Sequence, residues 1–497
     1  MASQQQDSKE VNPLRPQHHY VIIIGAGFSG LGTAIRLMQE NIHDFVILER
    51  GNDVGGTWRD NSYPGAACDV QSDLYSFSFA QNPDWTRNYA PQPEIFAYLR
   101  WCASKYDVYK HCRFYHEVEY AQWDDARQLW EVQTSQGTYS GNFVVSGAGA
   151  LCEPSYPKIK GLAEFAKVAG NSVFHSARWD HERDLSGRKV AVIGTGASAI
   201  QIIPAIQPKV KQLVVLQRTP PWVIPRDDRP RFERWLFRRI PILQTAMRAF
   251  LYIVRELFVI PMKYNLTAFR LLGLLQLYWQ VKDPKLRARI TPSYSMGCKR
   301  ILISNDYYPA ITQPNVSVVT EGIEEIEENH IVTRDGARHG VDTIVLATGF
   351  LVTDAPTPNF IRGRGGKLLA EAWRENIEAY KGTTIPGFPN SFILLGPNTG
   401  LGHTSQIVMI EAQINYIVEA IKYMRDHSQR TIEVKRDACR EYNEMIARKL
   451  RNTVWTSGGC KSWYQDSSGK NPVVWPDYTF VYWWKTRRFD FENFIFT

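Results

Sequence analysis

Two glycine-rich segments have the residue types and spacing to hold the phosphates of dinucleotides. The first is GAGFSG, with Gly25, Gly27 and Gly30, which follows the apolar run 21–24 and precedes the helix-like LGTAIRLMQEN. Glycines in such a turn let the backbone approach a pyrophosphate, and the free N–H groups of the following helix favour its negative charge. The segment therefore predicts a buried strand, a tight turn and a helix that bind a dinucleotide.

The pattern recurs at GTGASA, where Gly194, Gly196 and Ser198 lie between the strand-like KVAVIG and the helix-like AIQIIPAIQ. The strand after each unit ends in a charged residue 24 positions beyond the first glycine, Glu49 in the first unit and Arg218 in the second. A carboxylate accepts hydrogen bonds from a ribose, whereas a guanidinium can bind a 2′-phosphate through two bonds. We therefore expect FAD in the first unit and NADPH in the second, unless Arg218 is only a surface charge.

Two further strand-like segments, FVVSGAG at 143–149 and VDTIVLATGF at 341–350, each end in a small-residue turn. In the second turn, Thr348 and Gly349 would pass close to a bound nucleotide. The fold class expected is α/β, with two Rossmann-like dinucleotide-binding domains, for FAD and NADP, and a helical insert. Two such domains, one with an acidic and one with a basic residue at the matching strand end, imply that electrons pass from NADPH to a flavin. A single such domain would instead suit a dehydrogenase.

The order of these segments predicts the domain organisation. The N-terminus is polar and lacks the apolar core of a signal peptide, so we expect a disordered lead-in and a cytoplasmic protein. The expected parts are the lead-in at 1–18, an FAD-binding domain at 19–160 and 385–497, an NADP-binding domain with linkers at 161–228 and 291–384, and the helical insert at 229–290.

The insert carries most of the net charge of +8, because nine basic and two acidic residues lie between Arg229 and Arg270. Such a local excess gives no reason to expect nucleic acid as a partner. The insert is also the most apolar part of the chain, yet its longest uncharged run, Leu271 to Val281, is short of the roughly 18 residues that a membrane span needs. Basic amphipathic helices are expected, either as a cap over the core or as a contact with a membrane surface or an apolar substrate.

The seven cysteines are odd in number and form no CxxC pair. We expect free thiols in a reducing compartment, without a metal site and without a redox dithiol.

The segment after Glu49, GNDVGGTWRDNSYPGAACDV, resembles the fingerprint GGxWxxxxYPGxxxD of type I Baeyer–Villiger monooxygenases, and the resemblance extends over nearly the whole chain. The matching residues are Gly55, Gly56, Trp58, Tyr63, Pro64, Gly65 and Asp69. The resemblance implies that NADPH reduces FAD, that O2 then forms a C4a-peroxyflavin, and that this species inserts oxygen beside a ketone to give an ester or lactone. It also implies FAD contacts from Gly56, Thr57, Trp58, Asp69 and Tyr75.

The segment MGCKRILISNDYYPAI contains Lys299 and Arg300. The resemblance implies that Arg300 lies over the flavin and is oriented by Asp69, and that these two residues are catalytic. A fixed guanidinium can stabilise the negative oxygen that such a reaction needs. It further implies that Lys299 contacts the 2′-phosphate beside Arg218 and Thr219. The alternative for Lys299 and Arg300 is a solvated basic pair.

A second signature of the family, FxGxxxHxxxW, is kept only in part. His175 and Trp179 are present, but Ala169 and Asn171 replace the phenylalanine and glycine. The resemblance implies that His175 acts through an inter-domain linker, whereas a lone histidine is more often structural. It also implies that Trp463 and Tyr464 line the substrate pocket, with core packing as the alternative.

The function expected is the oxidation of an apolar ketone, long aliphatic or cyclic, by a monomer that needs NADPH and O2. One alternative is nitrogen or sulfur oxygenation, which needs no arginine over the flavin. A different class is a membrane-surface flavin-binding protein without oxygenase activity. Peripheral membrane contact through 229–290 is part of the expectation.

Overall fold

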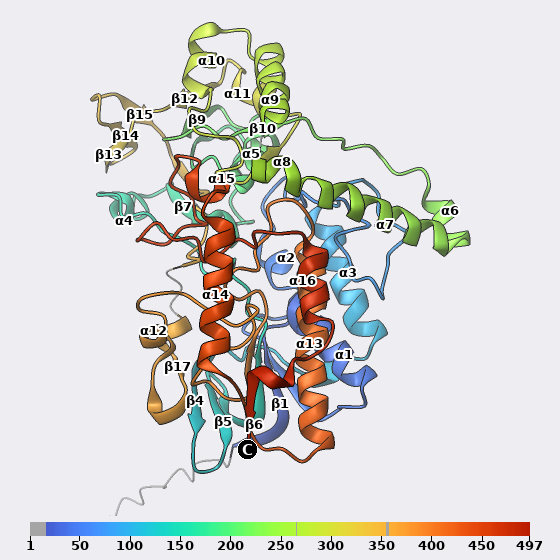
Figure 1. The fold of residues 1–497 in the computed structure, drawn as a ribbon. Coiled ribbons are helices and arrows are strands. Elements are labelled where there is room, and N and C mark those ends of the chain that lie inside the picture. The colour runs from blue at the N-terminus through green and yellow to red at the C-terminus, as the bar shows by residue number, and fades with distance from the viewer. Residues whose placement is uncertain (1–15, 265, 354–356) are drawn as a thin grey trace, which may run out of the picture.

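The computed structural model describes residues 16–264, 266–353 and 357–497. Two α/β units lie one above the other; residues 234–264 of the helical insert extend to the right, and residues 267–290 lie at the top beside the upper unit (Figure 1). The expected lead-in at 1–18 falls mostly outside the described residues, but Gln17 and His18 already belong to the first strand.

The first sheet is built around β1 (Gln17–Ile24), whose residues Val21, Ile22 and Ile23 are fully buried, as expected for a parallel strand covered on both faces. β1 pairs in parallel with β2 (Phe45–Leu48) and with β6 (Gly137–Ser146). The remaining strands are β3 (Cys112–Arg113), β4 (Val118–Asp124), β5 (Leu129–Thr134), β17 (Ile361–Arg362) and β18 (Ser391–Ile393). Helices α1 (Phe28–Gln39) and α13 (Gln406–Asp426) pack against each other beside this sheet.

The second sheet is entirely parallel. Its order is β12 (Val316–Val319), β9 (Gln212–Leu216), β8 (Lys189–Ile193), β16 (Thr343–Leu346) and β7 (Ser172–His175). Helix α5 (Ala197–Ile206) follows β8, just as α1 follows β1, so both predicted strand–turn–helix units are confirmed. A separate antiparallel sheet contains β13 (Ile323–Glu327), β14 (His330–Thr333) and β15 (Arg338–Gly340).

The insert at 229–290 is helical, as expected. Its helices are α6 (Arg234–Arg239), α7 (Pro241–Leu257), α8 (Val259–Tyr264), α9 (Thr267–Gln280) and α10 (Pro284–Ile290). Among the residues that the structure describes, no helix is both long and apolar enough to cross a membrane.

The other α-helices and strands surround these sheets and the insert. The helices are α2 (Thr57–Asp60), α3 (Gln92–Lys105), α4 (Leu162–Phe165), α11 (Tyr307–Ile311), α12 (Leu369–Ala372), α14 (Arg436–Leu450), α15 (Val454–Ser457) and α16 (Thr479–Thr486). The strands are β10 (Val223–Ile224), β11 (Leu302–Ile303), β19 (Ile432–Val434) and β20 (Phe494–Phe496).

One expected boundary differs from the structure. We assigned 291–384 to the second unit, but β17 pairs with β4 of the first sheet, through Ile361 and Arg362. Leu369 and Ala379 also pack into the core beside β1 and β6. The reason is that β16 completes the second sheet, after which the chain returns to the first unit well before residue 384.

Candidate functional site

Both glycine turns lie against the turn that ends a neighbouring strand. Gly25 has φ +91°, and a side chain there would meet the carbonyl oxygen of Gly147 at 2.9 Å. Gly194 has φ +121°, and a side chain there would meet the carbonyl oxygen of Ala347 at 2.2 Å. Only glycine allows this backbone conformation and this approach, so the turns after β6 and β16 lie directly against the two glycine loops.

The start of each following helix fits an anionic group. Gly27 and Gly196 are the N-cap residues of α1 and α5, and neither helix has a side-chain cap or an acidic residue in its first turn. The residues at both helix starts line one cavity of about 1430 Å³ to which both units contribute. Uncapped N–H groups at a helix start bind pyrophosphate, so the site fits the two dinucleotides.

Glu49 lies at the end of β2, where the sequence placed it, and its carboxylate borders the cavity. It accepts hydrogen bonds from the N–H groups of Ala26 (2.8 Å) and Gly51 (2.7 Å) and from Nη1 of Arg59 (2.8 Å). A carboxylate has about four acceptor positions, so one remains for a ribose hydroxyl. The contact of Arg59 could not be predicted from the sequence, because nothing in the spacing of Arg59 identifies Glu49 as its partner.

The second unit presents positive charge at the matching place. Arg218 is exposed after β9, and Lys299 lies close enough that burial, helped by the charge of Arg218, lowers its pKa. Thr219 is held by Thr195, whose hydroxyl donates to its carbonyl oxygen at 3.1 Å. All three predicted contacts to a 2′-phosphate border the cavity. Two converging cations suit a dianionic phosphate and oppose a carboxylate.

Asp69 and Arg300 form a two-point ion pair across the boundary of the units. Nε of Arg300 donates to Oδ2 of Asp69 at 2.6 Å, and Nη2 donates to Oδ1 at 2.7 Å. The third guanidinium nitrogen, Nη1, donates to the carbonyl oxygen of Leu401 at 3.3 Å. The side chain of Arg300 is 29% exposed and that of Asp69 is 27% exposed, and both residues line the cavity. The predicted pair is therefore formed and open to a bound molecule.

The ion pair fixes both charges. The Coulombic interaction with Asp69 raises the pKa of Arg300 despite burial. Burial alone would raise the pKa of Asp69, but Arg300 lowers it below its ordinary value. Asp69 is thus a carboxylate and Arg300 a guanidinium throughout the neutral range.

The fingerprint segment forms an aromatic wall of the cavity. The indole Nε1 of Trp58 donates to the hydroxyl of Tyr75 at 3.0 Å, and the two rings meet edge to face with centroids 5.5 Å apart. Burial raises the pKa of the Tyr75 hydroxyl, so it stays protonated. This geometry offers a flat apolar surface to an isoalloxazine ring.

A link between the two units was missed by sequence reasoning. The hydroxyl of Tyr63 donates to Oε1 of Gln201 at 2.9 Å, and Nε2 of Gln201 donates to the carbonyl oxygen of Ala67 at 3.0 Å. Gln201 belongs to α5, whereas its two partners belong to the fingerprint segment. Tyr63 belongs to the fingerprint, but Gln201 belongs to no sequence motif, so their contact could not be predicted.

Most predicted site residues gather around the one cavity. Those that line it are Gly25, Gly27, Glu49, Gly56, Thr57, Trp58, Asp69, Tyr75, Gly194, Gly196, Ser198, Arg218, Thr219, Lys299, Arg300, Thr348, Gly349 and Trp463. Gly30 lies behind the first loop, where a side chain would meet the carbonyl oxygen of Gly25 at 1.8 Å. No described residue of 229–290 lines this cavity, so the insert does not supply an apolar wall for substrate there.

Trp463 and Tyr464 differ in placement. Trp463 lines the cavity and is 44% exposed, whereas Tyr464 is buried behind it, with ring centroids 4.4 Å apart. Burial raises the pKa of Tyr464, and the nearby charge of Arg300 opposes this. Of the two, only Trp463 therefore borders the cavity, and its contact with substrate stays a prediction; Tyr464 packs behind it, near Arg300.

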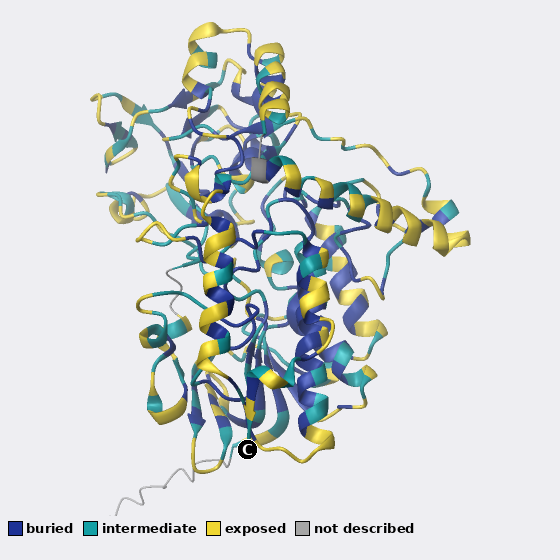
Figure 2. Ribbon diagram, in the orientation of Figure 1, coloured by how far each residue is buried: buried dark blue, intermediate teal, exposed yellow. Residues whose placement is uncertain are grey.

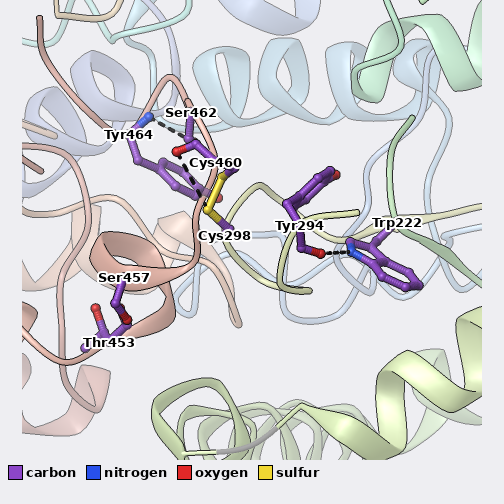
Figure 3. The surroundings of a disulfide bond; sticks show 8 residues. All are labelled: Trp222, Tyr294, Cys298, Thr453, Ser457, Cys460, Ser462 and Tyr464. Atoms are coloured by element: carbon purple, nitrogen blue, oxygen red, sulfur yellow. Dashed lines mark hydrogen bonds between the residues drawn. A yellow bond between two sulfur atoms is a disulfide. The ribbon is translucent and has the colours of Figure 1, made fainter. Parts of the chain in front are cut away.

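The expectation of free thiols throughout the chain is wrong. Cys298 and Cys460 form a disulfide, with Cα atoms 6.2 Å apart and a sequence separation of 162 residues (Figure 3). The bond joins the segment that carries Arg300 to the segment that carries Trp463. The other cysteines, Cys68, Cys102, Cys112, Cys152 and Cys439, are free. A separation of 162 residues leaves no local pattern, so spacing could not reveal the pair.

His175 lies at the end of β7, fully buried, within the second sheet. Its Nδ1 accepts from the N–H of Ala177 at 3.1 Å, and its ring packs edge to face on Phe350 at 5.9 Å. Burial lowers the pKa of His175 to about 4, and the nearby backbone of Gly349 opposes this shift. Trp179 packs on Phe174. His175 thus supports the turn after β16 from the side; the linker role remains a prediction.

Known proteins share this arrangement. The model of the family described as FMO-like, flavin-binding monooxygenase-like, matches residues 18–356. A Baeyer–Villiger monooxygenase of Pseudomonas aeruginosa is 47% identical over 497 residues, covering 99% of this chain and 94% of its own. The solved structure of OTEMO in complex with FAD and NADP matches with a TM-score of 0.84 and 26% identity, over 96% of this chain and 99% of that one. Cyclohexanone monooxygenase from Rhodococcus sp. Phi1, bound to NADP+, matches with a TM-score of 0.85 and 27% identity, over 97% and 99%.

The matches span both nucleotide units, the fingerprint segment and the ion pair of Asp69 with Arg300. The chain therefore belongs to the flavin-binding monooxygenase-like family and, within it, to the type I Baeyer–Villiger monooxygenases that use FAD and NADPH.

Proposed function

We propose that this enzyme carries out its Baeyer–Villiger oxidation on apolar ketones, long aliphatic or cyclic, and that Arg300 and Asp69 are its catalytic pair. The observation that carries the proposal is the two-point ion pair at the edge of the shared cavity. Bound FAD would supply the activated oxygen, and bound NADPH the electrons.

Arg300 has the charge and the rigidity that the reaction needs. Oxygen insertion beside a carbonyl passes through species with negative charge on oxygen, and a preorganised cation lowers their energy. Two bonds to Asp69 and one to Leu401 hold the guanidinium in one orientation. Because its charge does not depend on pH in the working range, it keeps a nearby oxygen anion deprotonated.

The coenzyme contacts follow from the two loops. The uncapped N–H groups after Gly27 and Gly196 would hold one pyrophosphate each. Glu49 would accept from the ribose of FAD, and Arg218 with Lys299 would bind the 2′-phosphate of NADPH. Charge at matching positions, positive in one unit and negative in the other, supports this assignment.

The residues near Arg300 favour an apolar substrate. Trp463 lies on the segment that the disulfide ties to the Arg300 loop, and Trp58 and Leu401 also border the cavity. Broad apolar surface with one cation suits a ketone that offers a single polar oxygen. The Rhodococcus relative is named for cyclohexanone, a cyclic ketone, which agrees with this class.

Sulfur or nitrogen oxygenation is the competing reaction, because a soft nucleophile does not need a guanidinium over the flavin. The decisive experiment is incubation with NADPH, O2 and a mixed panel of linear ketones, cyclic ketones, thioethers and amines, with products identified by mass. Esters or lactones as the main products support the proposal. Sulfoxides or N-oxides without esters would contradict it. We do not retain the alternative of a membrane-surface flavin-binding protein without oxygenase activity, because the chain belongs to a family of monooxygenases.

We also propose that the protein acts as a monomer. Sedimentation velocity on the FAD-bound chain tests this proposal, since a stable dimer would refute it.

A further inference from the structure

Helix α7 has the reverse of the usual surface-helix pattern: its charged side chains face the protein and its apolar side chains face solvent. All three of its charged residues, Arg248, Arg255 and Glu256, point toward the protein and are bonded there. Its exposed positions carry no charge. They are Pro241, Ile242, Leu243, Thr245, Ala246, Met247, Ala249, Phe250, Ile253 and Leu257. A helix on a soluble surface normally buries its apolar stripe instead.

The inward contacts fix this orientation. Nη1 of Arg248 donates to the carbonyl oxygens of Asp73 (2.6 Å) and Ser76 (2.9 Å). Glu256 accepts from the N–H of Thr479 at 2.8 Å. Rolling the helix over would break these bonds and leave buried partners unsatisfied, which is costly. The exposed apolar stripe is therefore a stable property of the fold.

The stripe is wide and continuous. Ile242, Phe250, Ile253 and Leu257 are 69%, 60%, 59% and 56% exposed, at the spacing of one helical face. Ile260 of α8 extends the row and is 44% exposed. Figure 2 shows α7 largely exposed along its length, where it projects from the body of the molecule. We call the exposed side chains from 242 to 260 the apolar face.

The charge at the outer end of this face is positive. Arg234, Arg238 and Arg239 of α6 are exposed. Arg238 forms an ion pair with Asp84, whereas Arg239 lies over the ring of Trp235, itself 60% exposed. The two acidic residues of the insert between 229 and 270 are already paired: Glu233 with Arg231, and Glu256 inside. A second copy of this face would bring like charges together, whereas an anionic surface would complement them.

We infer that the apolar face of α7 and the arginines of α6 dock the enzyme on an anionic lipid surface. The helix would lie in the plane of the interface, with Phe250 and Ile253 among the acyl chains and the arginines at the headgroups. The described residues of the insert do not border the cavity, so the docking contact involves none of the residues that line the cofactor site.

The test is co-sedimentation of the full-length, FAD-bound enzyme with vesicles of phosphatidylcholine, with and without phosphatidylglycerol, at low and high salt. The double variant Phe250→Asp/Ile253→Asp removes the apolar contact. The double variant Arg234→Glu/Arg239→Glu removes the charge. The matched control is Ile495→Asp, which changes an equally exposed isoleucine (52%) on β20. Flavin content and melting temperature show that each variant is folded.

The inference predicts that wild type and Ile495→Asp sediment with phosphatidylglycerol vesicles at low salt. Each insert variant should bind these vesicles at least about tenfold more weakly than the wild type does. Absence of wild-type binding, or equal binding by all variants, would overturn the inference. So would a wild-type dimer in solution that the aspartate variant dissociates, because the face would then be a contact between two copies.

Discussion

The two nucleotide-binding units share one plan and differ in one charge. In each, a buried strand leads through a glycine turn into an uncapped helix, and a neighbouring strand closes against that turn. The first unit ends its next strand in Glu49, held by two N–H groups and Arg59, whereas the second presents Arg218 beside Lys299. The shared part binds the phosphates that both dinucleotides have, and the differing part selects between them.

The largest effect should come from breaking the ion pair that joins the units. Arg300→Ala removes a fixed positive charge near the reacting oxygen, so ester formation should fall by about 10²- to 10³-fold or more. Flavin reduction by NADPH should continue, because Arg218 and Lys299 are untouched. The measurement is ester formed per NADPH consumed. Arg300→Lys, which keeps charge but not the two-point geometry, should recover little.

The disulfide is a second join between the Arg300 segment and the C-terminal part of the chain. Cys460→Ser should lower the stability of the FAD-bound enzyme by about 2–4 kcal/mol, because a bond between distant residues restricts the unfolded chain. Thermal unfolding with and without reductant measures this. Cys152→Ser, which changes a free thiol, serves as control. If reductant shifts the wild type no more than Cys460→Ser, the bond is not formed in solution.

Arg218 should matter for one coenzyme only. Losing a charge-assisted contact is worth about 1.5–3 kcal/mol, so Arg218→Ala should raise the KM for NADPH ~10- to 150-fold and leave that for NADH nearly unchanged. Steady-state kinetics with both coenzymes decide this. Equal increases would mean that Arg218 is only a surface charge.

Glu49 should have the smallest effect, on the other cofactor. Glu49→Gln keeps the shape but weakens its bonds to Ala26, Gly51 and Arg59, so the affinity for FAD should fall about tenfold. Titration of the apoenzyme with FAD measures it, with Asp44→Asn, an exposed acid at the start of β2, as control. An unchanged affinity for FAD combined with a weaker one for NADPH would reverse the assignment of the units.

Most of the fold and of the candidate site could be predicted from local sequence patterns. The glycine turns, Glu49, Arg218 and the fingerprint could be predicted because each depends on backbone geometry within a few residues. Arg59, Gln201 and the bond between Cys298 and Cys460 could not, because their partners are brought together only by the folded chain.

The orientation of α7 in the insert could not be predicted either. Its helices were predictable from periodicity, but the side of α7 that packs inward was not, because amphipathic spacing alone implies an apolar inner face. Here Arg248 and Glu256 find backbone partners in the neighbouring segments, and that decides the orientation. The strand β17 was assigned to the wrong unit for the same reason: short strands gain their place from the sheet edge that they meet.

The most direct test of the charge difference between the two units is the reduction of the bound flavin by each coenzyme without oxygen. Mixing wild-type enzyme with NADPH or NADH and following the loss of flavin absorbance separates coenzyme binding from the later chemistry. The account predicts saturation at a concentration of NADPH about tenfold or more below that of NADH. Equal half-saturation for the two coenzymes would contradict it.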